Sequence, residues 1–193
     1  MGMFSRKDMI RLFGPLLVEQ LLAVLVGMAD VVMVAAVGET AVSGVALVDS
    51  ISVLVIQVLS AMATGGAVVC SQYIGKKKPD QACRAAGQLV LITAALSLLI
   101  AAVAFIGNRH LLRLIFGSVE TAVMDNAQTY FWFTAMSYPF LALYNSGAAL
   151  FRSMGNSKVS MKVSLAMNAI NVAGNALCVF GLHMGVEGVA IPT

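Results

Sequence analysis

The chain has 193 residues, of which 60% are hydrophobic and only 11% are charged, and its formal net charge at pH 7 is +3. Soluble domains carry about a quarter charged residues, so this composition excludes a soluble globular domain. We expect an all-α polytopic membrane protein.

Five apolar stretches are long enough, or nearly long enough, to cross a bilayer core, which takes about 20 helical residues. In chain order they cover residues 12–37, 42–73, 89–106, 130–150 and 163–182. A sixth apolar segment opens at Val189 and stops at Thr193. The sequence therefore predicts five transmembrane helices and the start of a sixth, and we interpret the chain as a fragment of a longer protein.

The first stretch also invites a second interpretation, as a secretory signal. Arg6, Lys7 and Arg11 precede it, and a small-residue motif follows near Val34. The apolar part of a signal peptide spans only about 7–15 residues. Because residues 12–37 exceed that length and further spans follow, we expect a retained first helix.

The basic residues predict the orientation. If the spans alternate, one side of the membrane carries Arg109 and Arg113. The other side carries the larger basic set, which is Arg6, Lys7, Arg11, Lys76, Lys77, Lys78, Arg84, Arg152, Lys158 and Lys162. By the positive-inside rule the larger set is cytoplasmic, which puts the N-terminus in the cytoplasm and the protein in the cytoplasmic membrane. Because the basic segments alternate with apolar spans, membrane topology explains them better than a nucleic-acid-binding patch does.

Asp30 is the most informative residue, because a carboxylate at bilayer depth costs several kcal/mol unless it faces a polar interior. Glu19 precedes it by eleven residues, which returns to nearly the same helix face about 16 Å away. Glu19 is therefore a second cavity candidate, although it is equally well interpreted as an interfacial group.

A polar stripe marks the fifth stretch at helical spacing. It consists of Ser160, Ser164, Asn168, Asn171 and Asn175. Together with Asp30 and with Gln57 in the second stretch, the stripe predicts a shared wet interior. The alternative is that these groups hold helices together, at about 0.6–2 kcal/mol each.

Other motifs point away from an enzyme. The sequence has no phosphate-binding loop, nucleotide-binding glycine fingerprint or nucleophile elbow, and its three cysteines and two histidines have no metal-ligand spacing. We expect no cofactor and no metal, with transport driven by an ion gradient. Pro139 is expected to bend the fourth helix.

Several segments together resemble the N-terminal half of the multidrug and toxic compound extrusion (MATE) family. They are PLLVEQLLAVLVGMADVVMVAAVG from Pro15, ATGGAVVCSQYIG, ALFRSMGNSK, and NVAGNALCVFG followed by GVEGVAIPT. The resemblance implies one lobe of a transporter with two six-helix lobes, so that residues 1–193 would be an N-terminal lobe that lacks most of its sixth helix and its C-terminal partner lobe.

The resemblance also implies a site. The family's cation-coupling aspartate matches Asp30, and the groups beside it match Asn171 and Thr193; Pro15 matches a proline associated with helix bending. The family's second carboxylate is replaced by Asn175. One carboxylate with two amides carries a formal charge of only minus one, and desolvation favours its neutral form.

We therefore expect Asp30 to exchange a proton with the gradient during export of cationic or amphipathic compounds, with H+ and Na+ both open as the coupling ion. Membrane lipid is an expected partner and nucleic acid is not. Two alternatives remain: a lipid-linked oligosaccharide flippase of the same superfamily, and a membrane interaction protein that does not transport.

Overall fold

The computed structural model describes residues 6–192, with the side chains of Ile10 and of residues 13–192. Within this range every regular element is a helix. The elements are α1 (Arg6–Val37), α2 (Glu39–Gly75), α3 (Pro79–Phe116), α4 (Thr121–Ser153), α5 (Ser157–Ala176), the π-helical turn η1 (Leu177–Gly181) and α6 (Val186–Ala190).

The five predicted spans are confirmed as five long helices. The first four helices extend past the apolar stretches that predicted them, most of all α3 and α4, which begin at Pro79 and Thr121, while α5 begins earlier than predicted and gives way to η1 at Leu177. Hydropathy marks only the part of a helix at bilayer depth, while its polar ends continue into the interface. Both α1 and α4 run on through the prolines within them, Pro15 and Pro139.

Four of these helices are long and apolar enough to cross a membrane: the spans are Phe13–Val37, Glu39–Gly75, Pro79–Phe116 and Ser157–Gly181. Helix α4 is long enough but more polar, because it lies at the centre of the bundle against α2 and α3. Its polar side chains meet partners there. Tyr138 bonds Ser52 of α2 at 3.2 Å, and Ser146 bonds Thr93 of α3 at 2.7 Å.

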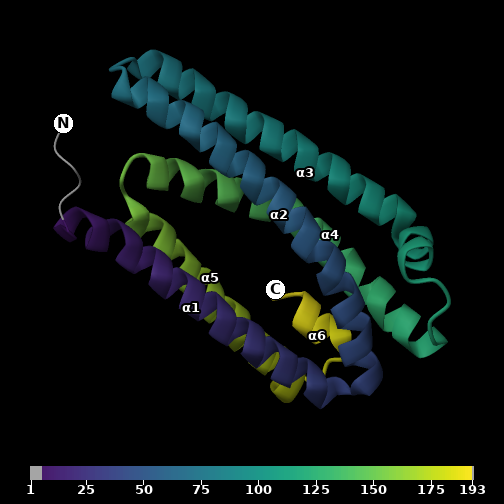
Figure 1. The fold of residues 1–193 in the computed structure, drawn as a ribbon. Helices are drawn as coiled ribbons and strands as arrows, with labels where there is room; N and C mark the ends of the chain where they lie inside the picture. Colours follow the sequence, from purple (N-terminus) through teal and green to yellow (C-terminus); the bar gives the residue numbers. More distant parts are fainter. Residues whose placement is uncertain (1–5, 193) are drawn as a thin grey trace.

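The helices form two groups (Figure 1). Helices α2, α3 and α4 pack together, while α1 lies alongside α5, and the short α6 sits between the two groups. The main buried cluster joins them, because it includes Val34 of α1, Val48 of α2, Phe131 of α4 and Val189 of α6. The α1–α5 pair is thus joined to the rest of the lobe by apolar packing at the level of α6.

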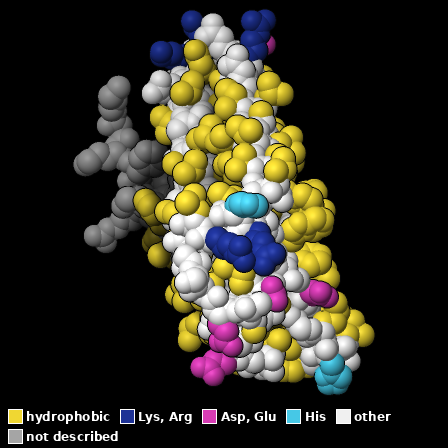
Figure 2. All heavy atoms as spheres, turned by 90° about the vertical axis from the view of Figure 1, so that its right-hand side faces the viewer, with side chains coloured by type: hydrophobic (Ala, Val, Ile, Leu, Met, Phe, Trp, Pro, Cys, Tyr) yellow, Lys and Arg dark blue, Asp and Glu magenta, His cyan; other side chains and the backbone are white. Residues whose placement is uncertain are grey.

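The surface in Figure 2 has a broad hydrophobic region between charged ends, as expected for a bundle that lies in lipid. The described basic side chains from Lys76 to Arg84 and from Arg152 to Lys162 lie in or next to the α2–α3 and α4–α5 turns, at one end of the bundle. Arg109 and Arg113 belong to the opposite end, near the α3–α4 turn.

Candidate functional site

Asp30 is held by α5. Asn175 Nδ2 donates a hydrogen bond of 2.8 Å to Asp30 Oδ1, and the same group lies 3.3 Å from Asn171 Oδ1 one turn earlier on α5. Asn175 is fully buried, whereas Asp30 and Asn171 are half-buried. The structure thus brings together three of the four residues predicted for the coupling site.

The fourth residue, Thr193, lies outside the described residues. Asn168 and Gln57, the remaining cavity candidates on α5 and α2, do not reach Asp30. Asn168 donates to Ser164 of its own helix at 3.4 Å, and Gln57 is exposed on α2 and does not line the cavity beside Asp30. Of the predicted polar stripe, the end nearest Asn175 is therefore the part that contacts the carboxylate.

Asp30 lines an open cavity of about 210 Å³ between α1, α2, α4 and α6. Its polar lining side chains are Asp30, Asp49 of α2 and Tyr130 of α4. The rest of the lining is small or apolar and comprises Gly27, Val31, Val34, Val42, Val45, Ala46 and Val189. We refer to it as the Asp30 cavity.

The charge in the Asp30 cavity is entirely negative among the described residues. Asp30 and Asp49 both line it, and no Lys, Arg or His does. The phenol of Tyr130, only 4% exposed, lies beside Asp49. Two carboxylates, a hydroxyl and apolar walls are suited to a proton, a small cation or a cationic group, and not to an anion.

Asp49 and Tyr130 are the residues that the sequence did not single out for this site. Asp49 stands near one end of its apolar stretch and reads as an interfacial carboxylate. A signal was nevertheless present, because Gly38 marks the turn between the first two helices. Counting 1.5 Å per residue from Gly38 puts Asp30 and Asp49 at similar depths, about 12 Å and about 16 Å from the turn.

Glu19 belongs to a separate cluster near the other end of α1. Its carboxylate accepts hydrogen bonds from Tyr144 of α4 at 3.0 Å and from Ser160 of α5 at 3.1 Å, and Arg152 lies 3.8 Å away. The Glu19 side chain is only 13% exposed. These contacts satisfy the carboxylate and tie three helices together, so Glu19 is a helix-joining group in this structure.

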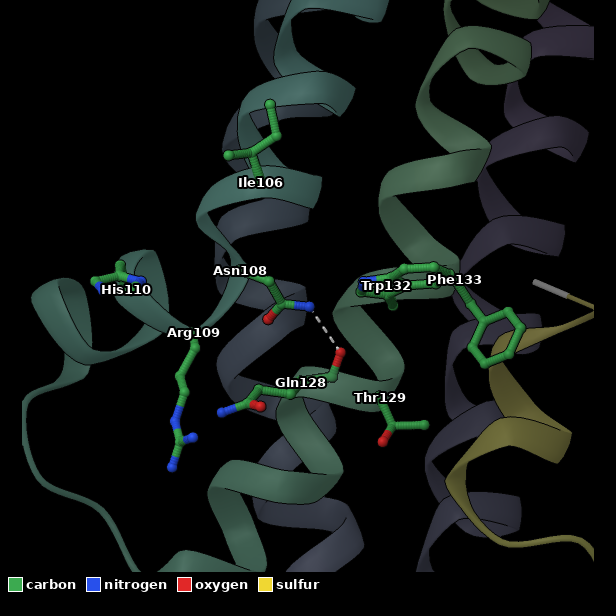
Figure 3. Close-up of a pocket in the computed structure, with 8 residues that line it drawn as sticks. All are labelled: Ile106, Asn108, Arg109, His110, Gln128, Thr129, Trp132 and Phe133. Atoms are coloured by element: carbon green, nitrogen blue, oxygen red, sulfur yellow. Dashed lines mark hydrogen bonds between the residues drawn. The ribbon is translucent and has the colours of Figure 1, made fainter.

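A larger cavity, of about 470 Å³, lies between α3 and α4 (Figure 3). In it Asn108 donates to the Gln128 backbone carbonyl at 2.9 Å, while the Arg109 side chain extends from the end of α3. No carboxylate is among the eight residues that line it. It therefore does not offer the chemistry of the Asp30 cavity. Elsewhere in residues 6–192 no three His, Cys, Asp or Glu side chains gather into a metal-binding group.

Comparison with known proteins places this fold in a family. The MatE family model matches residues 15–177. The chain is 30% identical over 190 residues to the uncharacterized transporter YisQ of Bacillus subtilis and 26% identical over 195 residues to the probable multidrug resistance protein NorM of Thermotoga maritima, covering 96% and 97% of this chain. It spans 41% of the length of each of these relatives.

The fold is shared with solved structures. One, an outward-facing multidrug resistance MATE family transporter of the MOP superfamily, superposes with a TM-score of 0.90 at 19% identity, over 97% of this chain and 41% of that one. The residues matched by the family model include both Asp30 and Asn175. The chain belongs to the MatE family.

Proposed function

We propose that this chain forms the N-terminal lobe of a cation-coupled exporter of cationic or amphipathic compounds, with H+ or Na+ as the coupling ion. The observation that carries the proposal is the position of Asp30, a half-buried carboxylate anchored by Asn175 and open to the Asp30 cavity. A carboxylate at this depth in an apolar helix is a functional group by default.

The proposed mechanism uses the two charge states of Asp30. Desolvation raises the free energy of the charged carboxylate, and a bound cation lowers it again. If the two orientations of the lobes expose the carboxylate differently, the empty and occupied states favour different orientations, which is what exchange of an ion for a substrate requires. A second lobe would complete the central pathway.

One of the relatives is a probable multidrug resistance protein, which agrees with export of small molecules. A lipid-linked oligosaccharide flippase has to accommodate a pyrophosphate, for which basic side chains are the natural partners. The lining of the Asp30 cavity has two carboxylates and no Lys or Arg among the described residues. That polarity favours a cationic or neutral substrate.

Efflux tests this proposal. The protein that contains this chain is expressed from its gene in cells. Efflux of a fluorescent organic cation from these cells, or from vesicles made from them, is followed while the proton and sodium gradients are collapsed in turn. We expect efflux to depend on one gradient and to fall at least tenfold in Asp30→Asn. Asp125→Asn changes an exposed carboxylate outside the Asp30 cavity and is the matched control.

Efflux that survives both collapsed gradients, or that is unaffected by Asp30→Asn, would contradict the proposal. The absence of any efflux from correctly inserted protein would favour the interaction-protein alternative. Export of a lipid-linked oligosaccharide in place of the organic cation would favour the flippase.

A further inference from the structure

We propose that Asp49 is the second carboxylate of the coupling site, so that the coupling cation, H+ or Na+, is held between α1 and α2 by Asp30 and Asp49 together. The inference rests on the proposed function and deepens it. The sequence predicted a site between the first and fifth helices, built from one carboxylate and two amides. The structure places the second charge on α2.

The first argument is the shared cavity. Asp30 and Asp49 both line the same space of about 210 Å³, although they are 19 positions apart in the chain, on either side of the turn between α1 and α2. Gly27 and Ala46 each precede one of these carboxylates by three residues and line the same cavity. Residues at this spacing share a helix face, so the absent and short side chains leave room between the two acids.

The second argument is that Asn175 and Asp49 act on Asp30 in different ways. Asn175 donates to Oδ1 from the α5 side, which leaves the other carboxylate oxygen for a cation on the cavity side. The Asn175 amide thus contacts Asp30 through its N–H₂ group, which is a donor and carries no charge. In this arrangement Asn175 fixes the orientation of Asp30, and Asp49 supplies the second negative charge.

The third argument is electrostatic. Two charged carboxylates line one cavity whose described lining has no basic side chain. Like charges that share a site of low polarity cannot both stay ionised at no cost, and one bound cation relieves the repulsion and part of the desolvation. A bound proton forms an O–H bond to one carboxylate, so the charge of the pair changes from minus two to minus one.

Tyr130 adds a neutral partner to the pair. It is 4% exposed, lines the Asp30 cavity and lies beside Asp49. A phenol hydroxyl can donate to a charged carboxylate and accept from a protonated one. Tyr130 can therefore offer Asp49 a hydrogen-bond partner in either charge state.

The experiment compares Asp49→Asn with Asp30→Asn and the control Asp125→Asn in the gradient-driven efflux assay, using the protein expressed from its own gene and checked for monodispersity. We expect Asp49→Asn to lower efflux at least tenfold, with Asp125→Asn within twofold of the unchanged protein. A smaller loss in Asp49→Asn, alongside a tenfold loss in Asp30→Asn, would overturn the role of Asp49 and leave the proposed function standing. Retained efflux in Asp30→Asn would overturn both.

A charge-relocation variant distinguishes an electrostatic role from a structural one. Asn175 contacts Asp30 directly, so Asn175→Asp puts a second carboxylate beside Asp30 from the α5 side. We expect the double variant Asp49→Asn with Asn175→Asp to recover at least a third of the original efflux, and a smaller recovery would overturn the inference. The double variant also decides the question if Asp49→Asn alone does not give monodisperse protein.

Discussion

The Tyr144 hydroxyl lies 3.0 Å from Glu19 Oε1, so that α4 donates a hydrogen bond to α1 across 125 positions of the chain. Hydrogen bonds to a charged group contribute about 1.5–3 kcal/mol when little water can replace them. The Glu19 side chain is only 13% exposed, which makes this contact a useful measure of how tightly α1 is held.

We expect Tyr144→Phe to lower the free energy of unfolding by about 1–3 kcal/mol, because the Glu19 carboxylate loses a donor that water cannot readily replace. Arg152→Ala should cost only about 0–1 kcal/mol, since Arg152 is more exposed and lies 3.8 Å from the carboxylate. Unfolding of the purified protein by SDS in detergent micelles measures both. A larger loss in Arg152→Ala than in Tyr144→Phe would show that the ion pair, and not the hydroxyl, is the main contact of Glu19.

A second prediction concerns the contact between α2 and α4 at Gly44. A Cβ added there would lie 2.9 Å from the Ala127 backbone nitrogen and 3.0 Å from the Asn126 Cβ. We expect Gly44→Ala to destabilise the lobe by about 1–3 kcal/mol, because backbone atoms cannot move aside as a side chain can.

Gly65 is the matched control on the same helix. A Cβ there meets nothing within 4 Å, so Gly65→Ala should stabilise the protein by up to about 1 kcal/mol through helix propensity. The same unfolding assay checks both substitutions. A stabilised Gly44→Ala variant would mean that α2 and α4 approach less closely than in this structure.

A third prediction separates two members of the polar stripe on α5. Asn175 is fully buried and donates to Asp30, whereas Asn168 is half-buried and donates only a bond of 3.4 Å to Ser164 among the contacts described. Asn175→Ala should therefore cost about 1–3 kcal/mol of stability. Asn168→Ala should stay within about 0.5 kcal/mol of the unchanged protein. Similar costs at both positions would mean that the stripe acts as uniform interhelical glue.

A fourth prediction tests the orientation. Cys83 is exposed near the start of α3, next to the basic α2–α3 turn, and the positive-inside rule puts that turn in the cytoplasm. In a variant with Cys70→Ala and Cys178→Ala, a membrane-impermeant maleimide should label Cys83 in inside-out vesicles and not in intact cells. Labelling in intact cells would reverse the predicted topology.

The sequence predicted the helices well because bilayer-length apolar runs leave few other folds. Helical spacing predicted that Asn171 and Asn175 share a polar face, and the resemblance to the MATE family predicted that this part of the face lies beside Asp30. The middle of the stripe, at Asn168, was less informative: helical periodicity says which residues share a face, and not how far along that face a neighbouring helix approaches.

The sequence did not single out Asp49 for the same reason. Whether a carboxylate near the end of an apolar stretch faces lipid headgroups or a neighbouring helix depends on how far the helix continues, and α2 begins at Glu39, ten residues before Asp49. Glu19 likewise required its partners, Tyr144 and Ser160, which come from distant parts of the chain.

The hydrogen bonds from Ser160 to Glu19 and from Asn175 to Asp30 fasten α1 to α5 at two levels, and both helices run in the same direction. Sliding one helix along the other by a single turn, about 5.4 Å, would break both fastenings at once. Tilting the two together breaks neither. Any movement of this pair against α4 would have to break the hydrogen bond from Tyr144 to Glu19.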